Sequence, residues 1–156
     1  MDVLLGPRPP LDVVLDGAKV LTSSSSRNSL ARAYVELACR VVDPFQETWV
    51  VDIDSSEGRG SMKKGCSPCL TKSRAPVGGH WVTSYGRRLG TDAMLKLQHM
   101  NPERLRRPNN VPMNAFNGMI GNAMSVNIVE VVLVTLSRSC PSVLGNNAPL
   151  PDRWSA

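Results

Sequence analysis

Two cysteines and two histidines have types and spacing that could hold a metal ion. Cys66 and Cys69 have the spacing of a zinc knuckle, and His80 and His99 could nominally complete four ligands. Zinc sites of this kind use a second closely spaced pair of ligands, which the sequence lacks. We therefore expect no metal site. We also interpret His80 as a loop or half-buried histidine, and we assign no catalytic residue to this chain.

Basic side chains gather in the middle of the chain, in a stretch rich in Gly and Ser. Long cations on a flexible backbone suit contacts with nucleic acid, since Arg can bind guanine through two hydrogen bonds and Lys acts mostly as a point charge. The alternative is an ordinary solvated surface. The candidate DNA-binding residues are Arg59, Lys63, Lys64, Lys72 and Arg74.

A third group that could take part in ligand binding is Gly121-Asn122-Ala123, which precedes an apolar segment. Gly121 permits a tight backbone turn, and the side-chain amide of Asn122 can hold a polar ligand. A helix that follows would add free N–H groups at its amino terminus. Such a turn could border a cofactor pocket, or it could simply begin a core helix.

The order of these groups resembles one known family. Arg87 to Gln98 (RRLGTDAMLKLQ) and then Met119 to Ser125 (MIGNAMS) are similar to two motifs near the end of DNA cytosine-5 methyltransferases. Those motifs read Arg-(Arg/Lys)-Leu-Thr-x-x-Glu-x-x-x-Leu-Gln-Gly and Gly-Asn-(Ala/Ser)-Val. Ser67 to Arg74 (SPCLTKSR), followed by Gly78-Gly79-His80, is similar to the family's target-recognition segment. The resemblance covers residues 45 to 138.

This resemblance implies a cofactor, S-adenosylmethionine, that binds only with a catalytic lobe which this chain lacks. By resemblance, Asn122 and Ala123 match positions that lie against the cofactor, while Gly121 provides the turn. The motif that begins at Arg87 is structural in the family and organises the base of the recognition region. The chain departs from the pattern at His99, where the family usually has Gly, and it lacks the family's Glu in the preceding helix.

The methyl-transfer machinery of the family is not visible in this chain. Its glycine-rich cofactor loop and its Pro-Cys-Gln, Glu-Asn-Val and Gln-x-Arg-x-Arg segments all precede the recognition region. Pro68-Cys69 imitates the nucleophile motif, but Leu70 follows it in place of Gln, and it stands too late in the motif order.

We therefore predict the carboxy-terminal part of a cytosine-5 methyltransferase, which contributes DNA target recognition and one edge of the cofactor pocket and is inactive alone. Its expected partners are DNA and the absent amino-terminal lobe. RNA stays open as the substrate, because related enzymes act on tRNA with the same motif order. The alternative is a non-catalytic basic DNA-binding or interaction module derived from the family.

Composition agrees with a polyanionic partner without identifying one. Lys and Arg number 18 against 13 Asp and Glu, for a formal net charge of +5. The amino terminus lacks the features of a secretory signal, no apolar run approaches membrane-spanning length, and four unevenly spaced cysteines do not make a disulfide framework. We expect an intracellular protein without a membrane partner, nuclear if its source is eukaryotic.

The elements that must position these groups indicate an α+β fold. We expect a small irregular β region, short helices and a C-terminal helix, as a fragment of a methyltransferase fold whose Rossmann-like lobe is largely absent. The predicted parts are an extended connector and amphipathic helix (1–44), the target-recognition region (45–118), the cofactor-side motif and helix (119–140) and a loose tail (141–156).

Local patterns place the individual elements. Serines 23–26 cap a predicted helix with an apolar face at Leu30, Tyr34, Leu37, Ala38 and Val41, ended by Asp43-Pro44. The remaining predictions are a strand at 48–53, a polar loop at 54–65, an extended segment at 80–85, a short helix capped by Thr91 or Asp92, and a loop at 104–117. For Val126 to Leu136, β-branched content favours a strand, whereas Asn127 with Glu130 resembles a helix cap.

Overall fold

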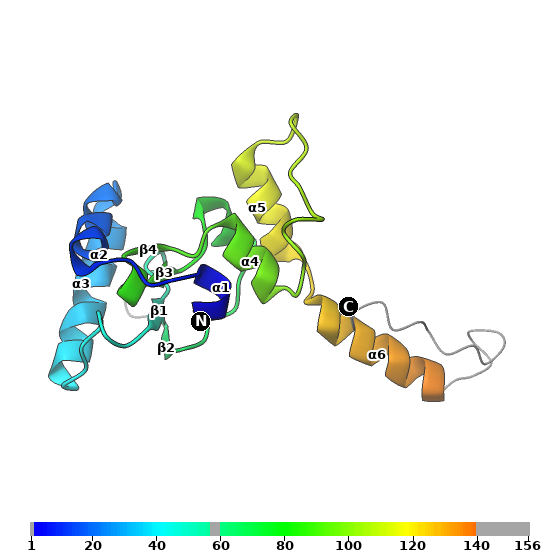
Figure 1. The fold of residues 1–156 in the computed structure, drawn as a ribbon, viewed down its shortest axis with the longest axis horizontal. Helices are drawn as coiled ribbons and strands as arrows, with labels where there is room; N and C mark the ends of the chain where they lie inside the picture. The colour runs from blue at the N-terminus through cyan, green and yellow to red at the C-terminus, as the bar shows by residue number, and fades with distance from the viewer. Residues whose placement is uncertain (1, 57–59, 140–156) are drawn as a thin grey trace.

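The computed structural model describes residues 2–56 and 60–139, and it shows a small antiparallel sheet between helices (Figure 1). The sheet has the strand order β2-β1-β3-β4, from β1 (Trp49–Val51), β2 (Met62–Lys64), β3 (Trp81–Val82) and β4 (Arg87–Arg88). The helices are α1 (Asp2–Leu5), α2 (Leu11–Gly17), α3 (Ser24–Cys39), α4 (Thr91–Leu97), α5 (Met113–Asn122) and α6 (Val126–Ser139). The predicted α+β class is confirmed.

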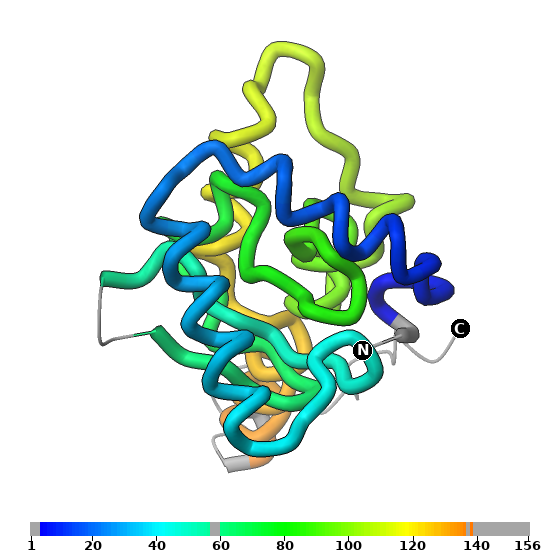
Figure 2. Tube along the Cα trace, turned by 90° about the vertical axis from the view of Figure 1, so that its left-hand side faces the viewer, coloured from blue at the N-terminus to red at the C-terminus, as the bar shows by residue number. Residues whose placement is uncertain are grey.

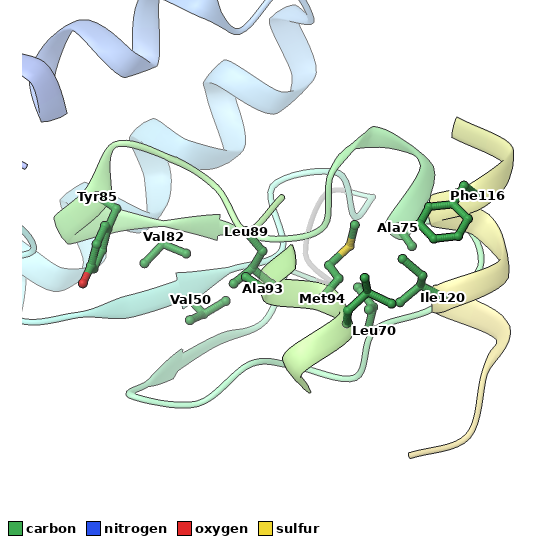
Figure 3. Packing of buried hydrophobic residues seen from close by; sticks show 11 residues of the cluster. Val50, Leu70, Ala75, Val82, Tyr85, Leu89, Ala93, Met94, Phe116 and Ile120 are labelled. Carbon is green, nitrogen blue, oxygen red and sulfur yellow. The ribbon is translucent and has the colours of Figure 1, made fainter. Parts of the chain in front are cut away.

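Strand β1 is central, and its two faces explain its run of apolar residues. Successive side chains of a strand point to opposite faces. Val50 packs with Val82, Leu89 and Met94 on the face toward α4 and α5 (Figure 3), whereas Val51 packs with Trp81 and Leu30 on the face toward α3. A strand buried on both faces carries no alternation of apolar and polar residues. The predicted strand at 48–53 is confirmed in shorter form, but the loop predicted at 54–65 contains β2.

Helix α3 begins as predicted and ends earlier. The Ser23 side chain accepts a hydrogen bond from the backbone N–H of Ser26 at 3.3 Å. After Cys39 the chain turns through Val41, whose φ is 57°, while Val42 N–H donates to Leu37 O at 3.0 Å. This is a Schellman motif, which usually places Gly at the left-handed position. Val41 is 95% exposed, so it is not part of the predicted apolar face.

Helix α4 ends in the same way. His99 has a φ of 57°, and Met100 N–H donates to Leu95 O at 2.9 Å. The left-handed conformation that suits Gly is therefore present here with a histidine in it. At its other end, the N-cap of α4 is Gly90, with no side-chain cap. The predicted cap, Thr91, lies inside the helix and donates from its hydroxyl to Asn117 Oδ1 at 2.8 Å.

The amino-terminal segment docks on the domain at 11–15 as the apolar run there indicated, but it contains helices where the prolines indicated an extended connector. Helices α1 and α2 and the 3₁₀ turn η1 (Ala18–Val20) lie along the body, and Val14 is buried. Tyr85 Oη donates to Gly6 O at 2.7 Å. Gly17 and Gly86 meet backbone to backbone, because a Cβ on Gly17 would lie 1.8 Å from Gly86 O. Residues 2–20 are therefore part of the packed domain.

Two helices correct the carboxy-terminal predictions. The loop predicted at 104–117 ends at Pro112, where α5 begins, and α5 buries Phe116 and Ile120 against the 3₁₀ turn η2 (Ala75–Val77). Val126 to Ser139 is helix α6, so the strand alternative for this segment was wrong. Figure 1 shows α6 extending away from the body. Cys140 and the predicted loose tail lie outside the described residues.

The expectation that no apolar run reaches membrane-spanning length was also wrong. Among the described residues, Met113–Leu136 is long and apolar enough for a span, by length and composition only. The stretch is interrupted at residues 123–125, and its first part, α5, packs on the core. Helix α6 alone has 14 residues, about 21 Å of helix against a hydrocarbon layer of about 30 Å.

Candidate functional site

The predicted DNA-binding residues lie along the outer strand of the sheet and the loop that follows it. Lys63 and Lys64 are exposed on β2, which forms one edge of the sheet. Lys72 is exposed in the turn before η2. Arg59 falls outside the described residues.

Two of these cations already have carboxylate partners. Lys64 Nζ lies 3.0 Å from Glu47 Oε2, and this hydrogen bond lowers the pKa of Glu47. Arg74 Nε lies 2.8 Å from Asp52 Oδ1, with Arg74 only 24% exposed. Within residues 2–56 and 60–139, Lys63 and Lys72 have no such partner. These two lysines are therefore the predicted cations that a ligand can reach. Arg74 instead stabilises the domain through its ion pair with Asp52.

A partly buried network around two aspartates was not visible in the sequence. The Asp52 carboxylate forms an ion pair with Arg74 and lies 3.8 Å from Nδ1 of the buried His80. The other ring nitrogen of His80, Nε2, lies 3.3 Å from the Cys69 carbonyl oxygen. Burial lowers the pKa of His80, because a desolvated ring resists taking up a proton. His80 thus ties the loop at Cys69 to the sheet as a neutral ring.

Asp54 forms the second half of this network. Arg88 binds its carboxylate through both terminal nitrogens and also donates to Gly79 O at 2.8 Å, while Ser26 Oγ donates to Asp54 Oδ1 at 2.8 Å. Burial alone would raise the pKa of Asp54, but the hydrogen bonds from Arg88 and Ser26 outweigh it and the pKa is lowered. These contacts join β4, the loop after β1 and the start of α3.

A cavity of about 720 Å³ lies beside the Asp54–Arg88 pair. Its walls are mainly apolar and include Val20, Leu21 and Val77. Among its polar residues, Asp54 accepts hydrogen bonds from Ser26 and Arg88, and the cavity is also lined by Thr22, Ser23, Ser25 and Arg87. The Asp54 carboxylate is therefore already engaged within the protein.

The predicted cofactor motif has a different local structure from the expected turn. Gly121 and Asn122 form the last turn of α5, and Gly121 has no positive φ. A Cβ on Gly121 would lie 2.4 Å from Thr71 O and 2.6 Å from Ala75 Cβ. The glycine is thus required for close packing of α5 on η2, which corrects its predicted role as a turn.

The other two motif residues lie at the end of α5. Asn122 is exposed, and its side-chain amide has no hydrogen-bond partner in the part of the chain that the structure describes. Ala123 is half-buried and has an extended backbone, with its N–H donating to Ile120 O at 3.1 Å. The break between α5 and α6 therefore begins at Ala123, two residues after the predicted turn at Gly121.

The cysteine and histidine positions do not converge. Cys66 and Cys69 are free, exposed thiols, His80 is buried, and His99 contacts Ser125 and Asn127 at the start of α6. Among the described residues, no group of three His, Cys, Asp or Glu side chains could hold a metal ion.

In comparisons with known proteins, no family model, curated protein or solved structure matches the chain.

Proposed function

We propose that this chain is the DNA-contacting carboxy-terminal part of a cytosine-5 methyltransferase, which works with a separate catalytic lobe. The observation that carries the proposal is the apolar surface of α6. Five of its large apolar side chains are at least half exposed, namely Ile128, Val131, Val132, Leu133 and Leu136. Large apolar side chains exposed together along one helix mark an interaction site. The resemblance assigns it to the cofactor lobe, on which the family's final helix packs.

The DNA contact rests on charge and placement. Lys63 and Lys72 are exposed cations without carboxylate partners in residues 2–56 and 60–139, and the whole chain carries a formal net charge of +5. Lysines on an outer strand and its loop can approach a phosphate backbone without moving the core. A stand-alone DNA-binding module is the alternative, and the open surface of α6 argues against it.

The cofactor edge fits the motif only in part. The exposed Asn122 amide and Ala123 could lie against S-adenosylmethionine once a lobe is present, because neither supports the core. Gly121 does not fit this role, since it is packed against Thr71. S-adenosylmethionine would supply the methyl group to the assembled enzyme, and this chain would supply only one border of its pocket.

Fluorescence anisotropy with a labelled duplex, titrated over salt concentration, tests the DNA contact. Phosphate contacts release about 0.9 counterions each, so Lys63→Ala/Lys72→Ala should reduce the salt slope by about two. Arg40→Ala is a matched control, because Arg40 is exposed and paired with Glu36 on α3. An unchanged slope in the double lysine variant, or no binding by the wild-type chain at low salt, contradicts the proposal.

Methyl transfer by the chain alone would contradict the fragment assignment. A cytosine-5 methyltransferase nucleophile needs a flipped base, a low thiol pKa and a carboxylic acid in one pocket, whereas the Cys69 thiol is exposed on a loop. Incubation with duplex DNA containing 5-fluorocytosine and S-adenosylmethionine should give no denaturation-resistant adduct. An adduct that requires the cofactor and disappears in Cys69→Ser would overturn the assignment.

A further inference from the structure

The segment between α4 and α5, residues 101–112, projects from the body of the domain (Figures 1 and 2). It contains three arginines, at 104, 106 and 107, against a single acidic residue, Glu103. Arg104 and Arg106 are exposed and have no ion-pair or hydrogen-bond partner among the described residues. The projection therefore presents open positive charge, unlike the largely paired Lys64 and Arg74.

Internal hydrogen bonds hold the shape of this loop. The Asn101 side chain accepts from Glu103 N–H at 2.8 Å, and its carbonyl accepts from Leu105 N–H at 3.0 Å. At the other limb, Val111 N–H donates to Pro108 O at 3.1 Å, and the Arg107 guanidinium donates to Val111 O. Arg107 thus stabilises the conformation of the loop. A loop ordered in advance loses less conformational entropy when it binds.

The exposed side chains of the loop have the chemistry of base recognition. Arg binds the O6 and N7 edge of guanine through two hydrogen bonds, and Asn binds the N6 and N7 edge of adenine in the same way. Exposed residues of both kinds occur here, with the 43%-exposed Leu105 between two of them: Arg104, Arg106, Asn109 and Asn110. Binding to an acidic protein surface would require only the positive charge of the arginines. The side-chain amides of Asn109 and Asn110 add hydrogen-bond donors and acceptors, which suit base edges.

We propose that loop 101–112 is a base-reading element that enters a groove of duplex DNA, with Arg104 and Arg106 on base edges. This inference rests on the proposed function and deepens it. The predicted cluster at Lys63 and Lys72 would contact phosphates, whereas the loop between α4 and α5 would distinguish sequences. The loop lies within the predicted target-recognition region (45–118) but outside the predicted basic cluster at residues 59–74.

Selection from a random duplex library with the full chain, followed by affinity measurements on the enriched and a scrambled duplex, tests the loop. The wild-type chain should prefer the enriched duplex. Arg104→Ala/Arg106→Ala should lower the ratio of the two affinities by about tenfold or more, because each lost base contact relaxes specificity. Lys63→Ala/Lys72→Ala should weaken both complexes equally and leave the ratio unchanged.

Three results would overturn the loop proposal. An unchanged ratio in the folded Arg104→Ala/Arg106→Ala variant would do so, as would a wild-type chain that binds DNA without preference; both leave the proposed function standing. Binding to a polyglutamate peptide but to no duplex, even at low salt, would assign the loop to an acidic protein and overturn both proposals. Unchanged far-ultraviolet circular dichroism would show that the variant is folded.

Discussion

Arg88 holds both carboxylate oxygens of Asp54, with Nη1 2.6 Å from Oδ2 and Nη2 2.8 Å from Oδ1. Both side chains are 20% exposed, so the pair is shielded from much of the solvent. Because Ser26 on α3 donates to the same carboxylate, the contact joins three parts of the fold that lie far apart in sequence.

Arg88→Ala should therefore lower the free energy of unfolding by about 2–3 kcal/mol, since it leaves Asp54 partly buried without its counter-charge. Urea unfolding measures the loss. Arg40→Ala is the matched control: its pair with Glu36 is more than half exposed and should contribute less than about 0.5 kcal/mol. Equal effects of the two substitutions would contradict this account.

Stability should fall as the solution is acidified through the histidine range. Burial holds the pKa of His80 below its ordinary value of 6.5, so the unfolded chain takes up this proton first. The stabilising contribution is therefore complete above pH 6.5 and is lost as pH falls through the folded-state pKa. Urea midpoints from about pH 8 to about pH 5 measure it. His80→Gln should flatten the profile, and an equally steep profile in this variant would refute the assignment.

Val41→Gly should stabilise the chain by about 1 kcal/mol, because Gly adopts the left-handed conformation without the clash of a β-branched side chain. Val41 is almost fully exposed, so little packing is lost. The same change at Val35, which is 64% exposed in the interior of α3, should destabilise by about 1 kcal/mol. Thermal unfolding distinguishes the two, and a destabilised Val41→Gly variant would show that this conformation carries no strain.

Gly121→Ala should destabilise by about 2–3 kcal/mol, since its Cβ would overlap the Thr71 carbonyl. Gly118→Ala, in the same helix, is the control: its Cβ would lie 3.6 Å from Pro76 Cγ, an ordinary contact, and should stabilise by about 0.5–1 kcal/mol. Urea unfolding compares them. A tolerated Gly121→Ala would mean that α5 does not pack closely on η2.

The purified chain should self-associate and bind a dye that reports apolar surface, because no other described segment covers the apolar side chains of α6. Ile128→Gln/Val132→Gln/Leu136→Gln alters positions four residues apart, on one face of the helix. This variant should be more monomeric by light scattering and should change stability by less than about 0.5 kcal/mol. A wild-type monomer without dye binding would show that the helix is covered.

The sequence predicted elements with strong local signals and missed the short ones. Ser23 and the apolar spacing from Leu30 to Leu37 were sufficient to locate α3. Strand β2 was missed, because three residues that include Lys63 and Lys64 have no apolar alternation to detect. Its position is determined by pairing with β1, which is a tertiary contact.

Helix α5 was missed for a different reason. Asn114, Asn117 and Gly118 favour turns and weaken the helical signal. A signal was nevertheless present, because Met113, Phe116 and Ile120 have helical spacing after Pro112.

The candidate site was predicted by residue type but not by pairing. Arg74 was identified as a cation, yet its partner Asp52 lies 22 positions away, and no local rule connects them. Whether a surface cation is open to a ligand depends on such distant neighbours. Composition and spacing alone therefore did not separate Lys63 and Lys72 from the paired Arg74.

The docking of the amino-terminal segment has a consequence for the order of events during synthesis. Gly6 and Leu5 are held by Tyr85 and Arg87, which follow them by 79 and 82 positions. The contacts that Tyr85 and Arg87 make with Gly6 and Leu5 therefore form only after more than half of this sequence has been synthesised. Leu5 and Gly6 are thus made long before the side chains that hold them.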